Sequence, residues 1–81
     1  MVKEIIYTKH ALERLEMRAI SRETIEDAIK NPDEMFKKNE IIIVHKLFGE
    51  KMLRVFYREN GNTITVILAY LTYTKRYKGV E

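Results

Sequence analysis

Three basic side chains near the start of the chain recur every four residues: His10, Arg14 and Arg18. Because steps of four residues advance only about 40° around a helix, we expect these side chains to form one stripe along a helical surface. Guanidinium groups bind phosphate through parallel N–H donors, and a neutral imidazole can take up or release a proton near neutral pH. The spacing therefore predicts an anion-binding surface on which His10 is a candidate general acid or base.

Structural roles for the same residues stay open at this point. His10 can instead hydrogen-bond a neighbouring carbonyl or carboxylate group, and the two arginines can form ion pairs with carboxylates such as Glu13, as charged helix faces usually do. The other histidine, His45, lies within an apolar and basic segment, and we interpret it as a structural or surface residue.

The C-terminal part of the chain interleaves aromatic and cationic residues. Tyrosine rings can stack on unpaired bases while lysine and arginine side chains contact phosphates. This pattern predicts RNA contacts for a set of six residues: Arg58, Tyr73, Lys75, Arg76, Tyr77 and Lys78. The alternative is a solvated basic tail whose tyrosines anchor it to the core.

Capping residues and periodicity predict two helices in the first half of the chain. Thr8 is a good N-cap for a helix that runs to about Arg18, and Ser21 is a good N-cap for a second helix. The second helix is expected to end at Asn31-Pro32, because proline disfavours a helical conformation in the residue before it. The basic stripe would thus lie on the first helix.

Strand-forming residues dominate the second half of the chain, where β-branched and aromatic side chains are frequent. The expected strands span residues 35–38, 40–48, 51–59 and 62–72. Turns at 48–51 and 59–62 join them as hairpins, and 2–7 is either an edge strand or an extended lead-in. We expect an α+β fold in a single domain, 1–81, with two N-terminal helices packed on a three- to four-stranded antiparallel sheet.

Alternation along the strands predicts which side chains share a face of the sheet. On the third expected strand Leu53, Val55 and Tyr57 share the predicted core face, whereas Arg54 and Arg58 lie among apolar residues on the other face. That mixture is unusual for a solvated surface, so we predict that Arg54 lies in a groove. On the last strand, strict alternation places one set of residues on a common face: Ile64, Val66, Leu68 and Tyr70.

The distribution of charge favours a polyanionic partner. The 81-residue chain has a formal net charge of +3. Residues 1–40 carry eight Lys and Arg against nine Asp and Glu, whereas residues 41–81 carry seven against three. A basic C-terminal half suits RNA, although a charge of this size also serves solubility alone.

Composition also limits the compartment and the cofactors. The absence of cysteine excludes disulfides and cysteine-based zinc sites, and no dense metal-ligand spacing occurs, so we expect no metal and no cofactor. The longest aliphatic run, 41–44, is far shorter than the roughly 20 residues of a membrane helix. Because the N-terminal segment also lacks the apolar core of a secretory signal, we expect a cytoplasmic protein with no membrane partner.

An ordered set of residues resembles one family of small prokaryotic proteins, the family described as domain of unknown function 4258. The resemblance covers about residues 7–77 and rests on four segments: Thr8-x-His10-Ala11-x-x-Arg14-x-x-x-Arg18-x-Ile20-Ser21, Ile29-x-Asn31-Pro32, Leu53-Arg54-Val55-x-Tyr57 and Val66-Ile67-x-Ala69-Tyr70. One position departs from the family pattern, because Ala19 stands where the family commonly has glycine. A left-handed helix end at alanine costs about 1 kcal/mol.

The resemblance implies both a fold and an activity. The family is similar in fold to the barnase/EndoU/colicin/RelE group of metal-independent ribonucleases and ribonuclease toxins, with BrnT-like toxins as a close comparison. It implies helices packed on an antiparallel sheet whose open face meets RNA. It also implies five candidate catalytic positions: His10, Arg14, Arg18, Arg54 and Tyr70.

The leading hypothesis from the sequence is a metal-independent endoribonuclease of toxin type. The three arginines would stabilise phosphate charge, His10 would move a proton and Tyr70 would orient bases. The alternative is a non-catalytic module that binds RNA or protein. A third hypothesis is one half of a toxin–antitoxin pair, whose main surface faces an antitoxin protein.

Overall fold

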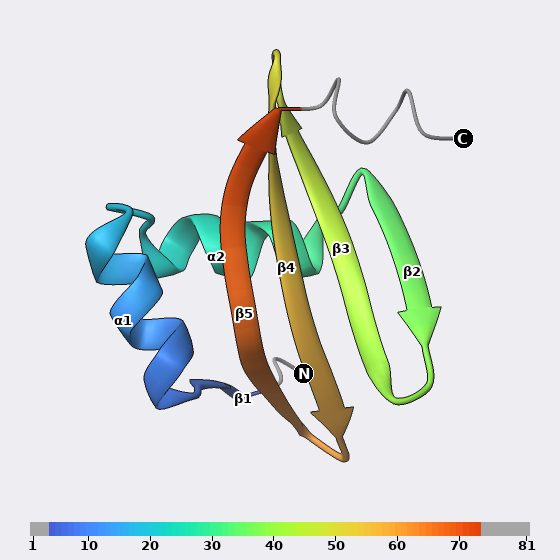
Figure 1. The fold of residues 1–81 in the computed structure, drawn as a ribbon. Helices are drawn as coiled ribbons and strands as arrows, with labels where there is room; N and C mark the ends of the chain where they lie inside the picture. The colour runs from blue at the N-terminus through green and yellow to red at the C-terminus, as the bar shows by residue number, and fades with distance from the viewer. Residues whose placement is uncertain (1–3, 74–81) are drawn as a thin grey trace.

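A five-stranded mixed sheet organises the chain in the computed structural model, which describes residues 4–73 (Figure 1). The strand order is β1-β5-β4-β3-β2. Along the chain the elements are β1 (Glu4–Tyr7), α1 (Lys9–Met17), α2 (Arg22–Lys30), β2 (Glu34–Lys38), β3 (Ile41–Phe48), β4 (Lys51–Asn60) and β5 (Thr63–Tyr73).

The expected three- to four-stranded antiparallel sheet is wrong, although the α+β class and the two N-terminal helices hold. The segment at the N-terminus forms a fifth strand, β1, which pairs in parallel with β5 and places Ile5 beside Ile64. The other three strand pairs are antiparallel. A four-residue strand whose partner lies at the far end of the chain carries no local turn signal, so hairpin analysis detects only the antiparallel part.

Both helices begin at the predicted N-caps. Thr8 Oγ1 accepts a hydrogen bond from the backbone N–H of Ala11 at 3.1 Å, and Ser21 Oγ accepts one from the N–H of Thr24 at 3.1 Å. These bonds satisfy donors that the first turn of a helix leaves unpaired. Asn31 caps the C-terminal end of α2 directly before the proline, as predicted.

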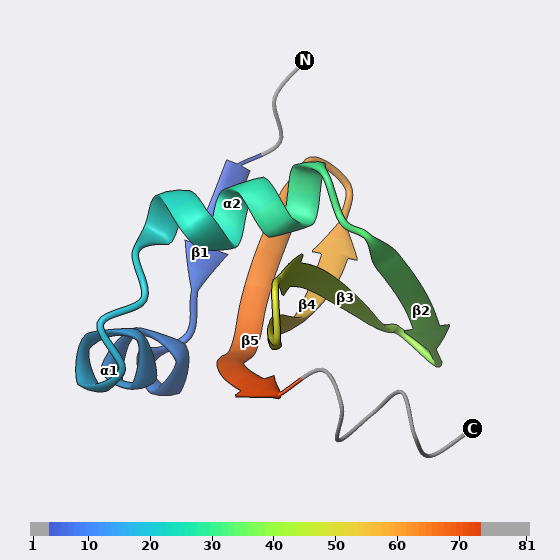
Figure 2. The same cartoon turned by 90° about the horizontal axis from the view of Figure 1, so that it is seen from above.

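The hydrophobic core lies between the helices and one face of the sheet. α1 packs along β5, whereas α2 lies across β3 and β4 (Figure 2). The fully buried members of the core include Ile25 and Ala28 of α2 and Leu53 and Val55 of β4. The predicted core face of β4 is therefore confirmed. No helix in the described part of the chain is long and apolar enough to cross a membrane.

The corner between α1 and α2 is left-handed at Ala19, whose φ is 54°. The strain that the sequence suggested at this position is therefore present. We expect Ala19→Gly to raise the free energy of unfolding by roughly 0.5–1 kcal/mol, because glycine relieves that strain but gains freedom in the unfolded chain.

Asn39→Gly is the matched control for this substitution, because Asn39 also has positive φ, at 58°. Asparagine tolerates the left-handed region better than alanine does, so its replacement is expected to change stability less. Chemical denaturation of the three proteins measures both effects. An Ala19→Gly protein that is less stable than the wild type would contradict the strain argument.

Tyr7 at the end of β1 joins the sheet to α2. Its hydroxyl donates to Glu26 Oε2 at 3.4 Å, and the Arg22 guanidinium lies 5.5 Å from the centre of its ring. Burial, followed by the Glu26 charge and hydrogen bond, raises the pKa of Tyr7 from 10.0 to about 12 despite the opposing effect of Arg22. The folded state therefore favours the neutral phenol.

This raised pKa predicts a loss of stability at high pH. The contribution of Tyr7 is fully present below pH 10.0, its unfolded pKa, and is lost as the pH rises through about 12. We expect the tyrosinate absorbance of the wild type to exceed that of Tyr7→Phe only above the pH at which an ordinary tyrosine titrates. A difference that develops fully around pH 10.0 would refute the prediction.

Candidate functional site

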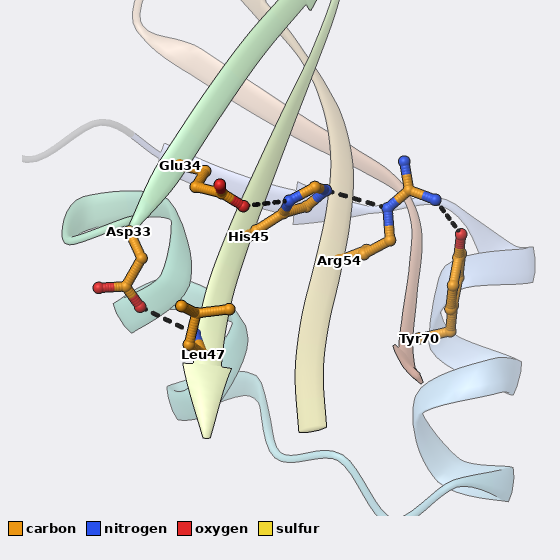
Figure 3. Close-up of polar contacts among 6 residues, drawn as sticks. All are labelled: Asp33, Glu34, His45, Leu47, Arg54 and Tyr70. Carbon is orange, nitrogen blue, oxygen red and sulfur yellow. Dashed lines mark hydrogen bonds and ion pairs between the residues drawn. The ribbon is translucent and has the colours of Figure 1, made fainter. Parts of the chain in front are cut away.

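Four polar side chains form one line across the face of the sheet that points away from the core (Figure 3). The strand registers place them directly opposite one another on β2, β3, β4 and β5: Glu34, His45, Arg54 and Tyr70. We call these four residues the polar row. The residues next to them along the chain, such as Val44 and Leu53, point to the opposite face and are fully buried in the core.

Hydrogen bonds connect the polar row from one end to the other. His45 Nδ1 lies 2.9 Å from Glu34 Oε1. On the other side of the imidazole, Arg54 Nε donates to His45 Nε2 at 3.0 Å, and Arg54 Nη1 donates to the Tyr70 hydroxyl at 2.6 Å. Three bonds thus hold the guanidinium and the imidazole in one orientation (Figure 3).

The donors and acceptors of the row define which ring nitrogen of His45 carries a proton. Arginine has only donors, so His45 Nε2 must accept and carry no proton. The remaining proton is then on Nδ1, which donates to the Glu34 carboxylate. His45 is therefore a neutral imidazole, and because it is only 5% exposed, it positions Arg54. The structural interpretation of His45 agrees with this placement.

Asp33 fixes the position of the first member of the row. Its backbone N–H donates to the carbonyl of His45 at 2.9 Å, and its carboxylate oxygen Oδ2 accepts from the N–H of Leu47 at 2.8 Å (Figure 3). These bonds tie the start of β2 to β3. Glu34 is consequently held opposite His45.

Aromatic rings surround the Arg54 guanidinium. Its central carbon lies 5.1 Å from the centre of the Phe56 ring and 5.7 Å from that of Tyr70. These two rings stack on each other with an interplanar angle of 24°. Cation–π contacts of this kind are attractive for a cation that is partly shielded from water. Arg54 thus lies beside two aromatic rings on the face that points away from the core, and its predicted position in a groove stays a prediction.

A β-bulge in β5 places Tyr70 in the polar row. The pairing of β4 with β5 shifts between Phe56 and Tyr57, and Ile67 is the additional residue on β5. Val66 before the bulge and Ala69 after it are both fully buried. The strict alternation expected for this strand is therefore wrong: Tyr70 does not share a face with Val66. The bulge re-aims the strand, as bulges often do beside functional sites.

The bulge lies against the N-cap of α1. The backbone N–H of Thr8 donates to the carbonyl of Val66 at 3.1 Å, and its hydroxyl donates to the carbonyl of Ile67 at 3.5 Å. A single threonine thus caps α1 and contacts the irregular part of β5.

A second line of side chains, which we call the apolar row, runs beside the polar row on the same face. Its members are paired across the same four strands: Phe36, Ile43, Phe56 and Leu68. Phe36 is 49% exposed, and its ring lies 5.1 Å from that of His45. Beyond this apolar row lies the exposed Arg58, opposite Ile41. The face therefore presents aromatic rings between two arginines.

The predicted basic stripe lies elsewhere. His10, Arg14 and Arg18 are all exposed, and the His10 side chain is 86% exposed with Glu13 at 3.9 Å. Among residues 4–73, no hydrogen bond or ion pair joins these three residues to the polar row. Arg18 is the C-cap of α1, so it lies just past the helix. A catalytic or phosphate-binding role for the stripe stays a prediction.

The structure combines two of the five candidate catalytic residues, Arg54 and Tyr70, in one hydrogen-bonded line. Among the candidate RNA contacts, Arg58 lies on the same face, and Tyr73 is 58% exposed at the end of β5. The remaining four lie outside the described residues: Lys75, Arg76, Tyr77 and Lys78.

Glu34 and His45 are the members of the row that sequence reasoning did not propose as site residues. A signal for His45 was present: the two-residue turn after Phe48 pairs that residue with Lys51, and counting back along both strands places His45 opposite Arg54. The same counting from the turn after Lys38 places Glu34 opposite His45. In the described part of the chain, no group of three or more His, Asp or Glu side chains could hold a metal ion.

Comparison with known proteins identifies one relationship. The family model described as domain of unknown function (DUF4258) matches residues 7–71. No curated protein and no solved structure matches the chain. The match covers α1, α2 and all four residues of the polar row.

Proposed function

Because this chain belongs to the DUF4258 family, whose description assigns no activity, we propose a function from the contacts of its polar row. The function is metal-independent cleavage of RNA in the cytoplasm, by an endoribonuclease of toxin type. The observation that carries the proposal is Arg54, held between His45 and Tyr70 among aromatic rings.

Arg54 is suited to binding a phosphate group. A planar guanidinium presents its donors in a fixed fork that matches two phosphate oxygens. The bonds to His45 and Tyr70 restrict the side chain before a ligand arrives. Less conformational freedom is then lost on binding, and the charge is already in place for the transition state.

The apolar row beside Arg54 is suited to binding unpaired bases. Single-stranded RNA is commonly bound by bases that stack on aromatic side chains of a sheet while cations contact the phosphates. Phe36 is exposed and Phe56 lies between Arg54 and Arg58 on β4. A short unpaired segment would therefore place its bases on the phenylalanines and its phosphates near the arginines.

The chemistry proposed is attack of the RNA 2′-oxygen on the adjacent phosphorus. The new bond closes a 2′,3′-cyclic phosphate, and the bond to the 5′-oxygen breaks. Solvent water takes the proton of the 2′-hydroxyl, because Glu34 and Tyr70 lie at opposite ends of the polar row, and Glu34 instead accepts from His45 and holds it in place. Tyr70 supplies a proton to the leaving oxygen, and Arg54 balances the charge on phosphorus. His45 contacts no reacting atom and acts as a positioning residue.

Cleavage of RNA in the presence of a chelator tests the proposal. The wild type is expected to yield 2′,3′-cyclic phosphate and 5′-hydroxyl ends. Tyr70→Phe preserves shape but removes the proton donor, so it is expected to lower the single-turnover rate at least about 100-fold. Glu34→Gln removes only the charged acceptor of His45 and is expected to lower the rate less. His10→Ala is the control and is expected to cleave at the wild-type rate.

Two outcomes would overturn this assignment. An absence of cleavage by the wild type would remove the nuclease activity, and loss of cleavage in His10→Ala alone would move the general base to the stripe on α1. Equal cleavage by all four proteins would identify a contaminating nuclease. Circular dichroism of each variant separates loss of chemistry from loss of fold.

A non-catalytic RNA-binding module is the second candidate. It is favoured by the engagement of both ring nitrogens of His45 within the row, which leaves the imidazole to hold structure. This candidate predicts binding of single-stranded RNA that weakens steeply with salt and yields no cleavage products. In the toxin proposal, the protein partner is an antitoxin that covers the same face. Mixing this chain with that antitoxin is expected to abolish RNA binding.

A further inference from the structure

β2 forms one edge of the sheet, with β3 as its neighbour on one side. All five of its residues are exposed, including Met35 at 56% and Phe36 at 49%. Figures 1 and 2 show this strand at the side of the sheet away from α1. An exposed edge with apolar side chains is a surface on which another strand can pair.

The hairpin geometry defines which backbone groups of β2 face outward. A two-residue turn joins Lys38 to Ile41, and the residues that close such a turn exchange hydrogen bonds with each other. Because bonded and non-bonded pairs alternate along an antiparallel ladder, Phe36 also bonds to β3. The N–H and C=O groups of Met35 and Lys37 therefore point away from the sheet.

The sequence of β2 is complementary to itself when two strands run antiparallel about a two-fold axis at Phe36. In that register Met35 of one copy faces Lys37 of the other, so the outward groups form two bonded pairs of two hydrogen bonds each. Glu34 of each copy then faces Lys38 of the other, which pairs opposite charges. The two Phe36 side chains meet at the axis as a non-bonded pair, the geometry with the closest side chains.

Other antiparallel registers are less favourable. A shift that centres the axis on Lys37 places two lysines directly opposite each other, and like charges at such positions are destabilising. A shift that centres it on Met35 leaves Lys38 without an opposite carboxylate from β2. Lysines on an edge strand normally discourage pairing, and here they permit it in one register.

We propose that two copies of this chain form a dimer by antiparallel pairing of β2, which joins their sheets into one. Lys38 of the second copy lies beside Glu34 in this arrangement, so each polar row gains a cation from the other copy. The proposal is independent of the activity proposed above, since it rests on the edge strand alone. It also brings two arginine-bearing faces into one continuous surface.

Sedimentation velocity over a range of protein concentrations tests the pairing. The wild type is expected to reach twice the mass of one chain, with slow amide exchange at Met35 and Lys37. Met35→Pro removes one outward donor and none directed to β3, and proline is tolerated on an edge strand. It is expected to remain monomeric, as is Lys38→Glu, because each raises the dissociation constant of the dimer at least about tenfold. Lys30→Glu, the same charge change at an exposed position of α2, is the matched control and is expected to dimerise like the wild type.

A mixing experiment identifies the register. Glu34→Lys and Lys38→Glu each place like charges opposite each other in a dimer of identical copies, so neither variant alone is expected to dimerise. Mixed together, the two variants bring each introduced charge opposite its complement, and a heterodimer is expected. A wild type that stays monomeric at every concentration, a dimer that survives Met35→Pro, or a mixture that stays monomeric would each overturn the proposal.

Discussion

Arg54→Ala is expected to lower the rate of RNA cleavage by about 100- to 1,000-fold, because the guanidinium is the group proposed to balance charge in the transition state. The substitution also removes the donor to His45 Nε2 at 3.0 Å and the donor to the Tyr70 hydroxyl at 2.6 Å. A buried acceptor that loses its donor costs about 1–3 kcal/mol of stability. The rate is therefore to be measured under single-turnover conditions at a temperature where the variant is folded.

Arg58→Ala provides the matched control for this prediction. Arg58 lies on the same strand and the same face but is exposed and outside the polar row, so its loss is expected to weaken RNA binding with little effect on the rate at saturation. Arg54→Lys tests geometry, because an ammonium cannot reproduce the planar fork. Wild-type cleavage by Arg54→Ala would exclude the guanidinium from the reaction.

Leu53→Ala is expected to produce the largest loss of stability, about 2–5 kcal/mol. Leu53 is fully buried in the core on β4, the middle strand of the sheet, where deletion of three carbons leaves a cavity. Because a small domain is stable by only about 5–15 kcal/mol, this substitution removes a large share of the total. Urea denaturation measures the effect.

Leu71→Ala is the control for the core substitution, since Leu71 lies directly opposite Leu53 on β5 but is 39% exposed. It is expected to cost less than about 1 kcal/mol. If the two variants lost equal stability, burial at Leu53 would not be the source of the effect.

Local features of the chain were predictable because neighbouring residues determine them. Thr8 and Ser21 cap helices through bonds to residues three positions on, and the turn after Phe48 lies between strands of evident β character. Alternation likewise identified Leu53 and Val55 as core and Arg54 as part of the other face. The sequence indicated only what a left-handed corner at Ala19 would cost, and the structure shows that the corner is left-handed.

Features that depend on distant pairing were not predicted. β1 pairs with β5 across almost the full length of the chain, and nothing within four residues signals that partner. The additional residue Ile67 has no glycine or proline to mark a bulge, so alternation wrongly placed Tyr70 on the same face as Val66. The contacts of this bulge are also long-range, because β4 pairs on one side of the bulge and Thr8 of the α1 cap bonds the carbonyls of Val66 and Ile67.

The basic side chains show the same division between local and long-range information. Spacing along one helix predicts that His10, Arg14 and Arg18 share one helical surface, and composition locates the basic excess in the second half. Only the tertiary structure decided that Glu34, His45, Arg54 and Tyr70 form one connected row. Helix periodicity acts over a few residues, whereas the row requires four strands in register and one bulge, which are set by packing of the whole sheet.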